Sequence, residues 1–163
     1  MKLALLPYGW LRCRFARYGG AVTDLNPQEL AERSAATMLG TDSATAYLGM
    51  RLLSVGPGRS ELQMTVTANM LNGYLIGHGG FIFSLADSAF AVACNSYNRV
   101  TVASGCDIDF VEAVQENDVL TATAVERFRR GRSGLYDITV RRADGAVVAE
   151  MRGRSREIGG TLF

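Results

Sequence analysis

One stretch of the chain constrains the fold more than any other, because it is apolar on almost every side. This stretch is FIFSLADSAFAVACN, residues 81–95, and its only polar side chains before Asn95 are Ser84, Asp87 and Ser88. A helix that is hydrophobic all round cannot lie on a surface, so other elements have to enclose it. The sequence therefore predicts a central helix and a wall that wraps it.

The segments on both sides of this helix supply the wall. Before it, runs at Ala46–Val55 and Ser60–Ala68 indicate a hairpin. After it come four strand patterns: Val100–Val111, Val119–Phe128, Gly134–Arg141 and Ala146–Ile158. The turns between them are too short for the crossover helices of a parallel sheet. We predict an α+β fold, a long central helix wrapped by a curved antiparallel β-sheet.

The start of the chain divides into a leader and a first helix. Asn26-Pro27 before QELAERSAATML supplies an N-cap and a proline at the first helical position, so a helix is expected as far as Gly40. Residues 1–25 mix basic and aromatic residues with proline and glycine, which favours a poorly ordered leader over a membrane-surface anchor. Residues 26–163 form a single expected domain.

Charge and cysteine content argue against several classes of protein. Lys and Arg number 17 against 16 Asp and Glu, which lacks the basic excess of a nucleic-acid-binding domain. The three cysteines form no CxxC pair, and the single histidine, His78, has no second ligand at metal spacing. We predict no metal, no membrane span and a reduced, cytoplasmic protein.

Two features carry the chemistry. Asp87 is a carboxylate in the middle of an apolar helix, where it cannot cap a terminus and is costly to bury charged. Gly79 and Gly80 open the same helix, where backbone N–H groups lack intrahelical partners and suit a developing oxyanion. From the residues alone, a structural Asp87 and a simple tight turn remain open alternatives.

The spacing of these features predicts a dimer. Asp87 follows Gly79 by eight residues, which is about 12 Å along a helix axis. One subunit cannot bring both groups to one substrate. We therefore predict a twofold homodimer with composite sites, each taking the amide from one subunit and the carboxylate from the other.

Three stretches of the chain resemble the PaaI-type hot-dog thioesterases of phenylacetate catabolism: MLNGYLIGHGGFIFSLADSAFAVACNSYN, VASGCDIDFV and RGRSREIGG. The resemblance runs from about residue 30 to the C-terminus. Its spaced pattern of Asn72, His78-Gly79-Gly80 and Asp87 is far more restrictive than HGG alone. It implies the hot-dog fold, dimers that often pair into a homotetramer, and hydrolysis of acyl-coenzyme A without a cofactor.

The resemblance also implies a role for each residue of this pattern. Asp87 activates a water as a general base or attacks the thioester carbonyl itself, and the Gly79 amide polarises that carbonyl. His78 and Asn72 orient the loop and the thioester. His78 alone is more typical of a loop-ordering residue than of a proton carrier.

The predicted substrate contacts extend beyond this catalytic set. Gly80 and Ser88 adjoin it, and Arg132 and Arg154 are candidates for the phosphates of coenzyme A. The resemblance suggests phenylacetyl- and hydroxyphenylacetyl-coenzyme A as substrates. Four aromatic residues are candidates for lining an acyl pocket or for the core: Tyr74, Phe81, Phe83 and Phe90.

Two other functions remain open from the sequence. A hot-dog acyl-coenzyme A hydratase or dehydratase would use His78 as its acid or base, but the chain offers no second histidine. A non-catalytic module would bind acyl-coenzyme A without turning it over. Such a module gains little from a buried Asp87.

Overall fold

The computed structural model describes residues 24–163, so the predicted leader lies almost wholly outside the described residues. The first helix, α2 (Pro27–Leu39), begins where the sequence predicts. The Asn26 side chain accepts hydrogen bonds from two backbone N–H groups of the first turn, and the Glu29 carboxylate accepts one from the Asn26 N–H. This reciprocal cap fixes the start of the helix.

The predicted strand at Ala46–Val55 is wrong over its first part. The chain there forms a short helix, α3 (Ser43–Tyr47), whose N-cap Asp42 accepts hydrogen bonds from two backbone N–H groups. Strand β1 (Arg51–Gly56) starts only after Gly49, which has a φ of 65°. Asp42, just before this run, is a helix-start signal that the strand prediction did not take into account.

In the described part of the chain, six antiparallel strands form one sheet in the order β1-β2-β4-β5-β6-β3. The remaining strands are β2 (Arg59–Thr65), β3 (Thr101–Phe110), β4 (Val119–Arg130), β5 (Ser133–Arg142) and β6 (Val147–Glu157). The four trailing strands agree with the predicted segments to within two residues at every end. Because β3 pairs with β6 alone, it forms an edge of the sheet within residues 24–163.

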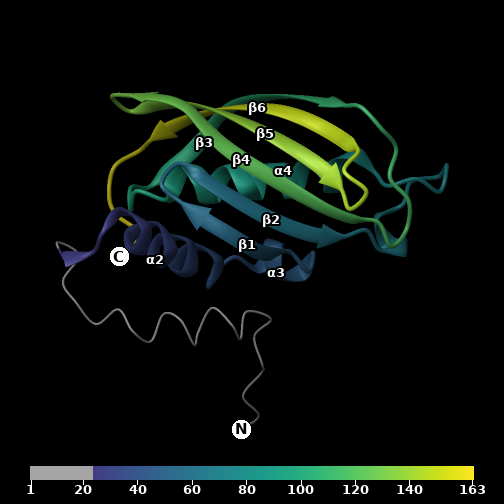
Figure 1. The fold of residues 1–163 in the computed structure, drawn as a ribbon, viewed down its shortest axis with the longest axis horizontal. Helices are drawn as coiled ribbons and strands as arrows, with labels where there is room; N and C mark the ends of the chain where they lie inside the picture. The colour runs from purple at the N-terminus through teal and green to yellow at the C-terminus, as the bar shows by residue number, and fades with distance from the viewer. Residues whose placement is uncertain (1–23) are drawn as a thin grey trace, which may run out of the picture.

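Helix α4 (Gly79–Asn95) crosses the inner face of this sheet, and Figure 1 shows the strands curving round it. Its Leu85, Ala89 and Phe90 are at most 1% exposed and join apolar residues from the strands in one core. The predicted α+β arrangement of a long helix wrapped by an antiparallel sheet is confirmed. Within residues 24–163, no helix combines the length and apolar character needed to cross a bilayer.

One stripe of α4 stays only half-buried. Its members lie at helical spacings i, i+3, i+4 and i+7: Ser84, Asp87, Ser88 and Ala91. All except Asp87 are small, so a second helix is able to approach this face closely. The expectation of a fully enclosed helix therefore does not hold within a single chain.

Candidate active site

The loop before α4 is shaped by Asn72. Its Oδ1 accepts hydrogen bonds from the N–H groups of Tyr74 at 2.8 Å and Ile76 at 3.5 Å. Its own backbone N–H donates to the Ile76 carbonyl at 2.8 Å. Both side-chain contacts use the acceptor oxygen, so within residues 24–163 the Asn72 side-chain amide nitrogen remains an unused donor.

His78 caps the first turn of α4. Its Nδ1 accepts a hydrogen bond from the Gly80 N–H at 3.2 Å, and its carbonyl accepts one from the Phe81 N–H at 3.0 Å. Because Nδ1 acts as an acceptor, the proton of the neutral imidazole belongs on Nε2. Among the described residues, the Gly79 N–H is left without an acceptor. The geometry thus selects one of the two glycine amides as the available donor.

Gly79 and Asn72 line the same apolar pocket, which has a volume of about 310 Å³. Phe110, the last residue of β3, places its ring directly against this glycine. A Cβ added at Gly79 would lie 2.9 Å from the tip of the ring. Glycine at this position therefore lets an aromatic ring and a free amide occupy the same corner.

Asp87 is half-buried on the open stripe of α4. Within residues 24–163, its carboxylate has no hydrogen-bond or ion-pair partner, and the neighbouring Ser88 does not supply one. Burial raises the pKa of Asp87 above its ordinary value of 3.8, because the charged form loses solvation. In the same residues, no three His, Cys, Asp or Glu side chains gather as metal ligands.

A single chain brings together only part of the predicted site. Asn72, His78, Gly79 and Gly80 meet in the turn that opens α4. Asp87 lies in the same unbroken helix, eight residues further on, which is about 12 Å along the axis. The described chain therefore holds the amide and the carboxylate apart, as the spacing requires.

The two predicted phosphate contacts lie elsewhere on the sheet. Arg132, in the β4–β5 turn, donates its Nε–H to the Glu157 carbonyl at 2.9 Å. Arg154 forms a 2.6 Å ion pair with Asp107, and this contact lowers the pKa of the Asp107 carboxyl. Because its neighbour Gly153 faces Phe90 of α4, Arg154 points to the outer face. Within one chain, Arg154 is therefore separated from Asp87 by the sheet.

None of the four aromatic candidates lines the pocket beside Gly79. Phe90 lies in the core, Phe81 and Phe83 pack partly buried against it, and Tyr74 is 88% exposed. The aromatic residue of the pocket is Phe110, which the sequence reading missed. Strand alternation gives its direction, but its place beside α4 depends on the pairing of β3 with β6.

A long helix wrapped by an antiparallel sheet, with a free amide at its first residue, is the arrangement of a hot-dog thioesterase. Residues 76–149 match the Thioesterase superfamily. Acyl-coenzyme A thioesterase PaaI of Escherichia coli strain K12 is 45% identical over 132 residues, which is 81% of this chain and 94% of that protein.

Solved structures give the same result. The E. coli PaaI protein from the phenylacetic acid degradation operon has a TM-score of 0.82 at 43% identity, covering 83% of this chain and 99% of that chain. A mutant of the phenylacetic acid degradation protein PaaI from Thermus thermophilus has a TM-score of 0.69 at 32% identity, covering 72% and 100%. The chain belongs to the PaaI-type acyl-coenzyme A thioesterases. The predicted hot-dog fold and enzyme class, a thioester hydrolase, are confirmed.

Proposed function

We propose that this protein hydrolyses arylacetyl-coenzyme A esters, of the phenylacetyl and hydroxyphenylacetyl type, in cytoplasmic phenylacetate catabolism. The observation that carries the proposal is the turn before α4, in which the Gly79 N–H has no acceptor among residues 24–163 and lies beside Asn72 in a mostly apolar pocket. The similarity to a PaaI protein from a phenylacetic acid degradation operon supports the choice of substrate. The reaction needs no cofactor, because coenzyme A is part of the substrate.

The chemistry divides between an oxyanion donor and a base. The Gly79 N–H donates to the thioester carbonyl oxygen, and the Asn72 amide and the His78 cap orient the loop around it. A water oxygen adds to the carbonyl carbon while Asp87 of the partner subunit accepts its proton, and the carbonyl electron pair moves to the oxygen. Collapse breaks the C–S bond and releases the carboxylic acid and the coenzyme A thiolate. Asp87 returns its proton to the thiolate, and the acid loses its own proton to solvent to become the carboxylate.

Direct attack by the carboxylate is the second form of the same proposal. Asp87 would then form a mixed anhydride with the acyl group and release the coenzyme A thiolate, and water would hydrolyse the anhydride. Both forms need Asp87 ionised and near the carbonyl. Both also place Gly80 and Ser88 at the margins of the reacting groups, as substrate-binding residues.

Two surfaces of the described chain support a homodimer. The edge strand β3 has no neighbour on its outer side within residues 24–163, and its inward-facing Ala103 and Phe110 are exposed. The half-buried stripe of α4 that contains Asp87 is also open. A second copy across β3 would cover both surfaces and set the two α4 helices side by side. Pairing of two such dimers into a homotetramer is part of the proposal.

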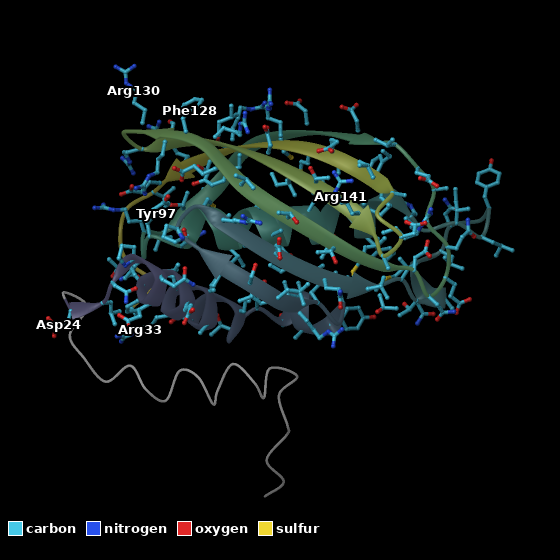
Figure 2. The ribbon with its side chains drawn as sticks, viewed as in Figure 1. Asp24, Arg33, Tyr97, Phe128, Arg130 and Arg141 are labelled. Atoms are coloured by element: carbon cyan, nitrogen blue, oxygen red, sulfur yellow. The ribbon has the colours of Figure 1, made fainter. Side chains whose placement is uncertain are left out.

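The phosphates of coenzyme A need cations at the mouth of this composite site. Arg132 uses only its Nε–H in the described chain, so its two terminal nitrogens are available as phosphate donors. Arg154 would have to exchange Asp107 for a phosphate. Figure 2 shows Arg130, in the same hairpin as Arg132, pointing away from the body of the fold.

The test is thiol release from a panel of aryl and aliphatic acyl-coenzyme A esters by the wild type and by Asp87→Asn. We expect aryl esters to be hydrolysed and kcat to fall by roughly 10²- to 10⁴-fold in the variant. Asp109→Asn, which removes an exposed carboxylate of β3, is the matched control. Binding without thiol release would overturn thioester hydrolysis, and an enoyl-coenzyme A absorbance assay would then separate a hydratase from a binding module.

A further inference from the structure

Most of the side chains that line the pocket beside Gly79 are apolar. Its lining side chains other than Asn72 and Glu112 are apolar, and the Glu112 carboxylate is paired with Arg142 at 3.1 Å. The apolar residues of the lining are Ile76, Ile82, Phe110, Val111 and Ala113. The proposed function assigns the pocket's two free donors, the Gly79 N–H and the Asn72 amide, to the thioester carbonyl and the loop around it. The remaining apolar surface suits a ligand group without hydrogen-bonding atoms, since a polar group buried there would lose its solvation.

The apolar lining distinguishes between the two parts of the substrate on either side of the thioester, the acyl group and the pantetheine chain. The pantetheine arm carries two amides, which need hydrogen-bond partners when they leave water. An arylmethyl group carries none. Its single ring also fits a pocket of about 310 Å³, a volume near the lower end for ligand sites. The chemistry of the lining therefore favours the acyl arm.

Phe110 is the aromatic residue of the pocket lining, and its ring lies against Gly79, whose N–H is the proposed donor to the thioester carbonyl. Its ring atoms lie 2.9 to 3.2 Å from the point where a Gly79 Cβ would be, so nothing separates ring and glycine. The side chain is 51% exposed in the single chain, so it faces the proposed dimer interface, where the composite site would lie. A carbonyl bound at the Gly79 N–H would place its acyl substituent next to this ring.

We propose that this pocket binds the acyl group and that Phe110 is its selectivity residue, favouring a single aromatic ring over aliphatic acyl groups. The ring of Phe110 contacts the aryl ring of the substrate in an offset or edge-to-face arrangement. Ile76, Ile82 and Val111 form the apolar remainder of the wall. The inference rests on the proposed thioesterase function and deepens it, because it assigns the acyl class to a named side chain.

The experiment compares ratios of kcat/KM for three esters: phenylacetyl-, cyclohexylacetyl- and acetyl-coenzyme A. Phe110→Leu keeps apolar bulk on the edge strand and removes only the aromatic face. We expect it to lower the phenylacetyl-to-cyclohexylacetyl ratio by roughly two- to tenfold, the range of one aromatic pair. Phe110→Ala should also lower the phenylacetyl-to-acetyl ratio, by roughly tenfold or more.

Phe128→Leu is the matched control. Phe128 is 56% exposed, close to the value for Phe110. It lies opposite Leu135, which lies opposite the outward-facing Arg154, so Phe128 is on the outer face of the sheet, away from the pocket. Figure 2 places it at the end of the β4–β5 hairpin. Its substitution should leave both ratios unchanged. Ratios also cancel any general loss of activity from a weakened dimer, which would reduce all three esters equally.

The outcomes separate the inference from the function on which it rests. Unchanged ratios in folded Phe110→Leu and Phe110→Ala would overturn the selectivity role while leaving thioester hydrolysis in place. If the wild type hydrolyses none of the esters, the proposed function fails. Dissociation constants of the same three esters, measured by calorimetry on wild type and Phe110→Leu, then decide whether Phe110 selects the ring.

Discussion

The turn that opens α4 and the middle of the same helix differ in whether their polar side chains have hydrogen-bond partners within the chain. In the turn, Asn72 and His78 use their side chains to satisfy neighbouring backbone groups, and within residues 24–163 the Gly79 N–H at the start of α4 has no acceptor. In the middle, Asp87 is half-buried and has no partner within residues 24–163. The turn is complete within one chain, whereas the middle of the helix is not.

This difference indicates where a second subunit is needed. A buried carboxylate without hydrogen-bond donors is costly, and the cost is acceptable where the group acts on a ligand or meets another chain. The turn needs no such help, because local hydrogen bonds fix it. Each region therefore makes its own prediction about what happens when it is changed.

The largest effect is expected from mixing two inactive variants. Asp87→Asn keeps the amide, and Gly79→Pro removes the N–H. The first helical position after an extended His78 (ψ 128°) accommodates the proline backbone, and the added Cβ also presses on the Phe110 ring, so this variant should be inactive on both grounds. Random co-refolding of equal amounts gives half mixed dimers, each with one intact composite site. About a quarter of wild-type activity should return. No recovery, with mixed dimers confirmed by mass spectrometry, would show that both groups act within one subunit.

A smaller effect separates the two glycines of the turn. Gly79→Ala keeps the N–H but its Cβ would meet the Phe110 ring at 2.9 Å, whereas a Cβ at Gly80 meets His78 at an ordinary 3.5 Å. Displacing the ring and the bound carbonyl should lower kcat/KM by roughly 10- to 100-fold in Gly79→Ala. Gly80→Ala should lose less. Equal losses would mean that the whole turn, and not the Phe110 contact, is sensitive.

The same contrast explains how much the sequence could predict. Spacing alone separated Gly79 from Asp87, because both lie in one continuous helix. The four trailing strands were predicted because alternation and turn residues are local signals. Phe110 was missed because its contact with Gly79 needs the long-range pairing of β3 with β6. Contacts between distant segments are set by sheet order, which local patterns do not encode.

His78 tests the completeness of the turn. His78→Ala removes the acceptor for the Gly80 N–H and should lower the free energy of unfolding by about 1 kcal/mol, the usual cost of losing an N-cap. His78→Asn keeps a capping acceptor and should retain most of that stability. Chemical denaturation of all three proteins at one concentration checks this. A stable but inactive His78→Asn would instead assign the imidazole a direct role in the reaction.

The smallest effect concerns the charge of Asp87. Because burial raises its pKa above 3.8, the folded protein holds this proton more tightly than the unfolded chain. The free energy of unfolding should therefore fall as the pH rises from the ordinary pKa through the raised one, and Asp87→Asn should remove that fall. The acid limb of the kcat/KM profile should lie at the same raised pKa, since the base must be ionised.

Urea unfolding of wild type and variant across this pH range, at matched protein concentration, makes the comparison. Parallel stability profiles would mean that the dimer supplies Asp87 with a partner that offsets its burial, and the carboxylate would then be a structural group of the interface.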